Sequence, residues 1–366
     1  MRTNTGTLVI ALGLLTCAAL ARAESDYSKD IVRRFDEGSV SHLRLENLAG
    51  RLLLERADGK ALELRATVRA DAFGDLEARD VAQLLDLRIE REGEGILIKA
   101  SYPLARYDRY RYGDADGGFF SGTTQTRVDG QKVRISMGRK GDGLPLWVDF
   151  QLRVPAEVDC DLRHLVGSVK AQALRGDLRV DCASAEIAIA RHEGAVLVDS
   201  GSGDIRVEGQ RGTLRLDTGS GDIKVEDLEG DFAADTGSGD IVLKRGRGER
   251  LDADTGSGDV LLSDASYPQL AIDTGSGDVR VGSILGALRR WKVDTGSGDV
   301  IFQLPGAGSS FRLEVDTASG EVECTFPSRD LRLERGRIRG LTVGDGAGLI
   351  IVDTGSGDVS LVETHP

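Results

Sequence analysis

Apolar and polar residues alternate along the C-terminal half of the chain, and a short polar phrase interrupts the alternation at regular intervals. In its full form the phrase is Asp-Thr-Gly-Ser-Gly-Asp followed by Ile or Val, as in residues 217–223. The residues three and one before its first Asp, and six and eight after it, are apolar in ten units. A period of two is typical of strands with one buried face, so each unit predicts a strand, a turn and a second strand.

The phrase returns at a nearly constant spacing. Weakened copies begin at Asp181 and Asp316, and the steps between these two are 18 to 22 residues long. Fuller copies begin at Asp199, Asp217, Asp235, Asp254, Asp273, Asp294 and Asp353. Because one strand pair buries too little surface to fold alone, a fixed period of this length predicts coils that stack on one another.

The last gap between copies, from Asp316 to Asp353, is 37 residues and leaves room for two steps. We therefore expect a degenerate coil near Glu334, with its apolar positions at Leu331, Leu333, Leu341 and Val343. Another degenerate unit, without the acid, is expected near Arg163.

The chain is thus predicted to be all-β, a parallel β-solenoid of about 18–22 residues per coil. A small, mostly-β N-terminal region with one helix at residues 75–87 is expected to precede it. The predicted domains are a signal peptide at 1–23, a β-rich capping region at 24–157 and the repeat solenoid at 158–366. The capping region contains a Tyr- and Gly-rich insertion at 102–145.

The first residues have the layout of a secretory signal. Arg2 precedes the apolar run from Leu8 to Leu15, and Ala21-Arg22-Ala23 fits a cleavage site. We therefore expect export to the periplasm or cell envelope, or secretion. Cys17 allows a lipid-anchored form, which is the less favoured alternative. No later segment is long and apolar enough to predict a transmembrane helix.

The insertion at 102–145 concentrates aromatic and basic side chains. Tyr and Arg suit contacts with glycans and protein surfaces, whereas a flap over a strand edge is the structural alternative. Long insertions of this kind are often functional. The candidate contact residues are Tyr102, Tyr107, Arg109, Tyr110, Arg111, Tyr112, Phe119 and Phe120.

The composition excludes only a few classes of partner and says little about the cellular compartment. The formal net charge of −13 disfavours nucleic acid and anionic lipid headgroups. The mature chain would hold Cys160, Cys182 and Cys324, of which the first and last fall on core positions. Buried free thiols are therefore the favoured interpretation, and a Cys160–Cys182 bridge is the alternative.

The acidic residues of the phrase form two predicted columns along the stack. Stacked carboxylates repel each other, so each either accepts N–H bonds in its turn or shares a cation with its neighbours. We favour structural turn residues without a cofactor and keep weak Ca²⁺ binding as the alternative. The predicted turn residues are Asp199, Asp204, Asp217, Asp222, Asp235, Asp240, Asp254, Asp259, Asp273, Asp278, Asp294, Asp299, Asp353 and Asp358.

Two enzyme classes fit the sequence poorly. Aspartic proteases also use Asp-Thr-Gly-Ser, but they need two such loops facing each other across a cleft. Here the copies would follow one another along a single ladder. A glycan-active enzyme on a β-helix needs an irregular cluster of acid, base and Arg on one face, and the four His residues are scattered. We therefore predict no catalytic residues and no metal ligands.

The whole arrangement resembles the toastrack family of "putative adhesins" of unknown function. The resemblance rests on the start of the chain, the stretch from Leu45 to Gly50, the strand ending at Leu152-Arg153-Val154-Pro155, and the Ser-Gly-Asp-Ile/Val repeats. It implies an exported envelope protein with a β-solenoid and gives no agreed biochemical role. The insertion at 102–145 departs from the family pattern.

These features predict a non-catalytic exported cell-envelope protein, adhesin-like or a scaffold, that presents a rigid repetitive surface. Its expected partner is an envelope protein or glycan, and not nucleic acid. A calcium-binding structural repeat protein is the first alternative, and a glycan-active enzyme on a β-helix is the remote one.

Overall fold

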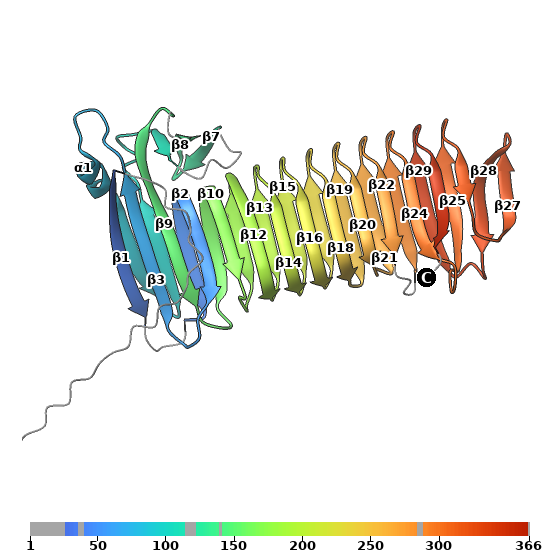
Figure 1. Ribbon diagram of the computed structural model, residues 1–366, viewed down its shortest axis with the longest axis horizontal. Helices are drawn as coiled ribbons and strands as arrows, with labels where there is room; N and C mark the ends of the chain where they lie inside the picture. The colour runs from blue at the N-terminus through green and yellow to red at the C-terminus, as the bar shows by residue number, and fades with distance from the viewer. Residues whose placement is uncertain (1–25, 36–39, 114–121, 139–140, 284–287, 365–366) are drawn as a thin grey trace, which may run out of the picture.

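The computed structural model describes residues 26–35, 40–113, 122–138, 141–283 and 288–364. Nearly all of the regular structure in these ranges is β, with thirty strands and the single helix α1 (Ala78–Gln83). Figure 1 shows an elongated body in which the strands lie side by side along the long axis. The predicted all-β parallel solenoid is confirmed. The predicted signal peptide at 1–23, with Cys17, lies outside the described residues.

Each regular coil contributes one strand to each of two parallel sheets. The first sheet contains, in spatial order, β11 (Leu178–Cys182), β13 (Val196–Ser200), β15 (Leu214–Thr218), β17 (Phe232–Thr236), β19 (Arg250–Thr255), β21 (Gln269–Thr274), β23 (Arg290–Thr295), β29 (Gly348–Thr354) and β25 (Phe311–Thr317). The second contains β12 (Ser184–Glu193), β14 (Ile205–Arg211), β16 (Ile223–Glu229), β18 (Ile241–Arg247), β20 (Val260–Ala265), β22 (Val279–Ser283), β24 (Val300–Pro305), β30 (Val359–Thr364) and β26 (Val322–Cys324).

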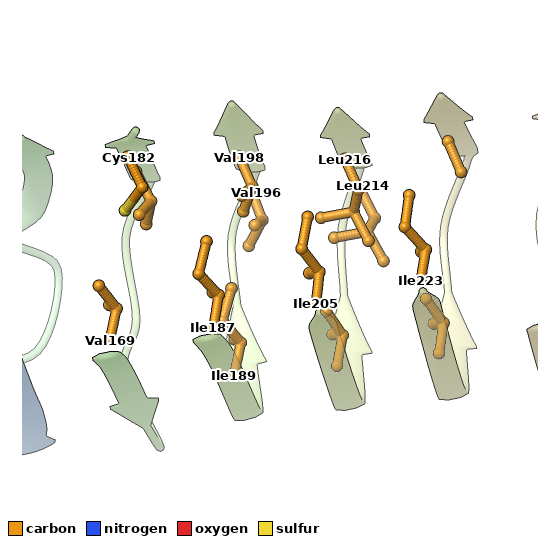
Figure 2. Packing of buried hydrophobic residues seen from close by; sticks show 14 of the residues in the cluster. Val169, Cys182, Ile187, Ile189, Val196, Val198, Ile205, Leu214, Leu216 and Ile223 are labelled. Atoms are coloured by element: carbon orange, nitrogen blue, oxygen red, sulfur yellow. The ribbon is translucent and has the colours of Figure 1, made fainter. Parts of the chain in front are cut away.

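The core is the thin layer between these two sheets. Figure 2 shows Val198 and Leu216 from one sheet pointing toward Ile205 and Ile223 from the other. All four are at most 1% exposed. Within the strands, alternate residues such as Arg206 and Arg215 face solvent, as the period of two predicted. Strands β13 and β15 pair in parallel without a shift, so Leu216 lies beside Val198 and Asp217 beside Asp199.

The solenoid has a second corner that the repeat phrase did not reveal. At this corner a residue with positive φ recurs in the successive coils from Arg191 to Asp264: Arg191, Asp227, Arg245 and Asp264 have φ of 53° to 58°, and Gly209 has φ of 69°. The left-handed conformation turns the chain there, although non-glycine residues rarely adopt it. Since four of these five residues are not glycines, no repeated local sequence signal marks the corner.

The solenoid continues into the N-terminal region without a break in the ladder. Strand β2 (His42–Arg56) runs the length of a coil and pairs in parallel with β10 (Asp159–Gln172). Strands β5 (Gly95–Ser101) and β9 (Leu144–Val154) pair with the other edge of β2. The expected degenerate unit near Arg163 is part of β10 and stacks on β11.

A buried polar network fastens these first coils. Nε2 of His164 lies 2.9 Å from the Gly50 carbonyl oxygen, and Nδ1 lies 3.3 Å from the Asn47 amide nitrogen. Burial lowers the pKa of His164 to about 4, so the ring is neutral at pH 7. A neutral ring donates to Gly50 through Nε2–H and accepts from Asn47 at Nδ1. The stretch from Leu45 to Gly50 is therefore a structural joint between β2 and β10.

Antiparallel strands close the N-terminal end. Strand β1 (Tyr27–Phe35) pairs with β3 (Leu62–Ala70), which pairs with β9, and β4 (Asp86–Glu92) forms a hairpin with β5. Helix α1 packs beside β1, β3 and β9. The insertion forms a small sheet in which β8 (Gln131–Met137) lies between β6 (Arg109–Tyr112) and β7 (Thr123–Val128).

The order of the coils at the C-terminal end differs from the order in the chain. Strand β29 lies between β23 and β25, and β30 lies between β24 and β26. The last coil therefore inserts between two coils that precede it in sequence, and Figure 1 shows its red strand among orange strands at this end of the body.

The prediction of a degenerate coil near Glu334 is wrong. Residues there form an antiparallel hairpin of β27 (Ser328–Glu334) and β28 (Arg337–Val343), and β28 pairs with β25 at the end of the ladder. Leu331 and Leu333 are 50% and 58% exposed, whereas Leu341 and Val343 are buried. The chain needs this reversal because its last coil must return to the slot beside β23.

Candidate functional site

A buried threonine closes the turn in most copies of the repeat phrase; the copy that begins at Asp199 has Ser200 in its place. Thr255 donates its hydroxyl to the Gly239 carbonyl of the preceding coil at 2.9 Å and accepts the Gly258 N–H at 3.1 Å. The same pair of bonds recurs at Thr236. Both threonines are 1% exposed, so each hydroxyl is a buried group with both of its hydrogen-bonding roles satisfied.

The second Asp of the phrase links neighbouring coils. Asp259 Oδ1 accepts the backbone N–H of Asp278 at 2.8 Å, and Asp278 Oδ1 accepts that of Asp299 at 3.0 Å. The chain of bonds continues through Asp358, which lies on the inserted coil. These carboxylates were expected to bond their own turns, but each one accepts from the next coil along the stack.

The first Asp of the phrase has a different environment. Among the described residues, none of these seven carboxylates has a hydrogen bond from a backbone N–H, and Asp294 pairs instead with Lys292 at 3.4 Å. They form an outward row along the first sheet, because threonine already closes the turn. The members of this row are Asp199, Asp217, Asp235, Asp254, Asp273, Asp294 and Asp353.

A shallow hollow of about 300 Å³ runs along the middle of this row. The small side chains Ala233 and Ala271 form its floor, and the long side chains Arg215 and Lys292 lie at its two ends. Among the described residues, no group of three His, Cys, Asp or Glu side chains is placed to hold a metal ion. The carboxylates form a line instead of surrounding a point, which suits the six to eight oxygens of Ca²⁺ poorly.

The row carries unfavourable charge at neutral pH. Partial burial and the neighbouring carboxylates of Asp235 and Asp273 raise the pKa of Asp254 above its ordinary value. The pKa of Asp217 is raised by the same two causes. A raised carboxyl pKa means that ionisation costs folding free energy, and this cost disappears when the pH falls below the unfolded-state pKa.

Asp254→Asn should therefore stabilise the protein at pH 7. Like charges opposite each other in a sheet cost about 0.2–1 kcal/mol, which corresponds to a melting temperature about 1–3 °C higher. The gain should vanish near pH 3, where both side chains are neutral. Thermal melts of the wild type and the variant across this pH range test the prediction. A lower melting temperature for the variant at pH 7 would show that the Asp254 carboxylate stabilises the folded protein.

The structure separates the candidate contact residues of the insertion. Tyr110 and Tyr112 are buried at 0% and 4% exposure, so their proposed role as surface contacts is wrong. They alternate with Arg109 and Arg111 along β6, and the inward positions of that strand belong to the core. Tyr112 packs edge-on against buried Trp147.

The remaining candidates are tied to the scaffold in different ways. Tyr102 donates its hydroxyl to Asn47 Oδ1 at 3.0 Å, and Arg111 pairs with Asp71 at 3.0 Å. Tyr107 packs edge-on against Phe73. Phe119 and Phe120 lie outside the described residues. Of the named candidates, exposed Arg109 is the one that faces solvent most fully, and it pairs with Asp142.

A cationic surface beside Arg109 was missed from the sequence. Lys132 and Arg134 lie on β8, which neighbours β6, and Arg127 lies on β7, which neighbours β8; all three are exposed. We call Arg109 and these three residues the basic face. Alternation in residues 123–137 was the available signal, because every second residue there faces solvent.

Comparison with curated proteins finds no sequence that matches the chain. Among the described residues, no helix is long and apolar enough to span a bilayer. Solved structures that resemble the chain include "putative adhesins" from Parabacteroides distasonis and Parabacteroides merdae and a "putative cell adhesion protein" from Clostridium sporogenes.

The structural likeness is loose. The two Parabacteroides proteins are 12% and 8% identical, with TM-scores of 0.36 and 0.31; the alignments cover 91% and 92% of this chain and 97% of each of theirs. The Clostridium protein is 10% identical with a TM-score of 0.21, and covers 92% of this chain and 100% of its own. TM-scores this low carry no argument about function. The family model of Toastrack DUF4097 matches residues 185–362, and the resemblance to the toastrack family is thereby confirmed over that range.

Proposed function

We propose that the protein is a non-catalytic, adhesin-like scaffold of the cell envelope. The observation that carries this proposal is the continuous ladder of coils, in which hydrogen bonds from the second-Asp column and from the buried threonines join each coil to the next. Such a stack is stiff along its axis and repeats its outer surface at strand spacing. A stack of this kind suits a protein that holds a binding region at one end at a fixed distance from its other end.

The polar groups of the repeat support a structural role. The threonines and the second Asp residues of the phrase form hydrogen bonds between coils. The first Asp residues form an outward row, and among the described residues no set of functional groups faces that row. A catalytic site needs acid, base and electrophile to converge on one reacting atom. The export that this function requires rests on the predicted signal peptide.

Binding of the full-length protein to isolated cell envelopes tests the proposal. We expect saturable retention of the folded protein and no release of new reducing ends from envelope glycans. Heat-unfolded protein is the matched control. Absence of saturable retention would contradict the scaffold function, and newly released reducing ends would favour the glycan-active enzyme.

A further inference from the structure

The basic face covers the outward side of the small sheet in the insertion. Arg109 of β6 lies opposite Arg134 of β8, which also lies opposite Gln125 of β7. Lys132 and Arg127 form the next row, two residues further along β8 and β7. Residues that pair directly point to the same side of a sheet, so the four cations share one face.

The inward side of the same sheet anchors it to the body. Tyr110, Val133 and Ile135 are at most 2% exposed and belong to the continuous core. The cations are therefore carried on a strand framework and their backbone positions are fixed by the β6–β8 and β7–β8 pairing. A preorganised face loses little conformational freedom when a ligand binds.

Much of the positive charge on this face is unneutralised. Arg127 and Lys132 have no ion-pair partner among the described residues, whereas Arg109 pairs with Asp142 at 2.6 Å. With the Gln125 amide turned so that its hydrogen bonds are satisfied, its oxygen accepts from the Arg134 guanidinium at 2.6 Å and is a neutral acceptor. Asp108 is the one acid that lines the hollow between these side chains. The face is thus cationic on a chain of formal net charge −13.

The cations surround a hollow of about 440 Å³. Gln125 also lines it, on the same side of the sheet as Arg134, and offers a neutral hydrogen-bonding group. The two rows of cations lie about 7 Å apart, twice the rise of a strand residue. Arginine side chains at this spacing can each take a carboxylate or sulfate in a two-point contact.

We propose that the basic face binds an anionic glycan, a polysaccharide that carries carboxylate or sulfate groups. The inference rests on the proposed adhesin-like function and names the ligand class of its binding end. Single-stranded nucleic acid would need exposed rings for base stacking, and the aromatic side chains of β6 point into the core. The Gln125 amide, on the same face, is suited to sugar hydroxyls.

Titration of the full-length protein with a labelled polyuronate, polygalacturonate, tests the proposal. The test variant carries Arg127→Gln and Lys132→Gln, both at exposed positions outside the core. The matched control carries Lys170→Gln and Arg179→Gln, which remove the same charge from the exposed surface of the first coils. Sulfated dextran and neutral dextran are run as parallel ligands to separate charge from sugar, and a single-stranded RNA oligomer tests the other polyanion class.

We expect the test variant to bind polygalacturonate at least tenfold more weakly than the wild type and the control to stay within twofold. Binding should weaken with added salt, and neutral dextran should not compete. Equal affinity of the test variant and the wild type would overturn the proposal. Tighter binding of RNA than of either anionic glycan would also overturn it.

The envelope-retention assay separates this inference from the scaffold function. If wild type and test variant are retained equally by envelopes and neither binds polyuronate or sulfated dextran, the glycan inference fails and the scaffold function stands. If envelopes retain no form of the protein while the polyuronate still binds at the basic face, the scaffold function fails and the glycan site stands.

Discussion

Replacing Gly258 by alanine should lower the unfolding free energy by about 3 kcal/mol or more. A Cβ atom at this position would lie 1.9 Å from the carbonyl oxygen of Gly239 in the preceding coil. Both groups belong to hydrogen-bonded backbone, so the contact can be relieved only by separating two coils. A thermal or urea melt of the variant measures the loss.

Gly59→Ala is the matched control for this substitution. An added Cβ at Gly59 has no neighbour within 4 Å, and the residue lies in a turn before β3. We expect its unfolding free energy to stay within about 0.5 kcal/mol of the wild type. Equal melting temperatures for the two variants would contradict the close stacking of the coils.

Ile223→Asp should cost about 4–5 kcal/mol of stability. Ile223 is 0% exposed and points into the layer between the two sheets. A carboxylate there would lose its hydration without gaining a partner, and the aliphatic packing would be lost as well. Because every coil supports its two neighbours, the damage should propagate along the solenoid.

Lys224→Asp, one residue further along β16, is the control. Lys224 faces solvent and pairs with Asp222 at 2.8 Å, so its replacement breaks a surface ion pair and adds a nearby like charge. The expected cost is about 1 kcal/mol. Similar melting temperatures for the Ile223 and Lys224 variants would show that the inward and outward assignment is wrong.

The regular coils could be predicted because the sequence repeats the same physical constraint many times. The apolar residues beside each phrase, such as Leu214, Leu216, Ile223 and Val225, give both the strand period and the coil length. Among the glycines of the phrase, Gly203 and Gly221 have positive φ. Close approach between coils is the more general reason for glycine in the phrase, as the carbonyl contact at Gly258 shows.

The order of the last coils could not be predicted from the sequence. The units at Asp294, Asp316 and Asp353 carry similar phrases and the same apolar positions, so any of them could stack on any other. Their order depends on long-range pairing, which local patterns do not determine. The hairpin at 328–343 was mistaken for a coil because Leu331 and Leu333 alternate like core residues although they are exposed.

The candidate site was predicted only in part. Arg109 and Arg111 alternate with Tyr110 and Tyr112, which is the pattern of a strand with an inward aromatic side. Grouping these four residues together as contact residues overlooked their alternation. Arg127, Lys132 and Arg134 become neighbours of Arg109 only through the β6–β8 and β7–β8 pairing, which depends on tertiary structure.

Paired cysteines test the central claim, a single ladder into which the last coil is inserted. Lys292 and Ile351 lie directly opposite each other on neighbouring strands. Cysteines at these positions would have Cα atoms about 5 Å apart, which suits a disulfide. The control pair places cysteines at Lys292 and Glu314, which neighbour each other if coils stack in chain order.

The structure separates the control pair by the inserted strand β29, about 10 Å, which is too far for a disulfide. Mild oxidation followed by peptide mass spectrometry identifies which pair has linked. We predict a disulfide between Cys residues introduced by Lys292→Cys and Ile351→Cys and none between those introduced by Lys292→Cys and Glu314→Cys. Linkage of the control pair alone would contradict the inserted coil and show that the coils stack in the order of the chain.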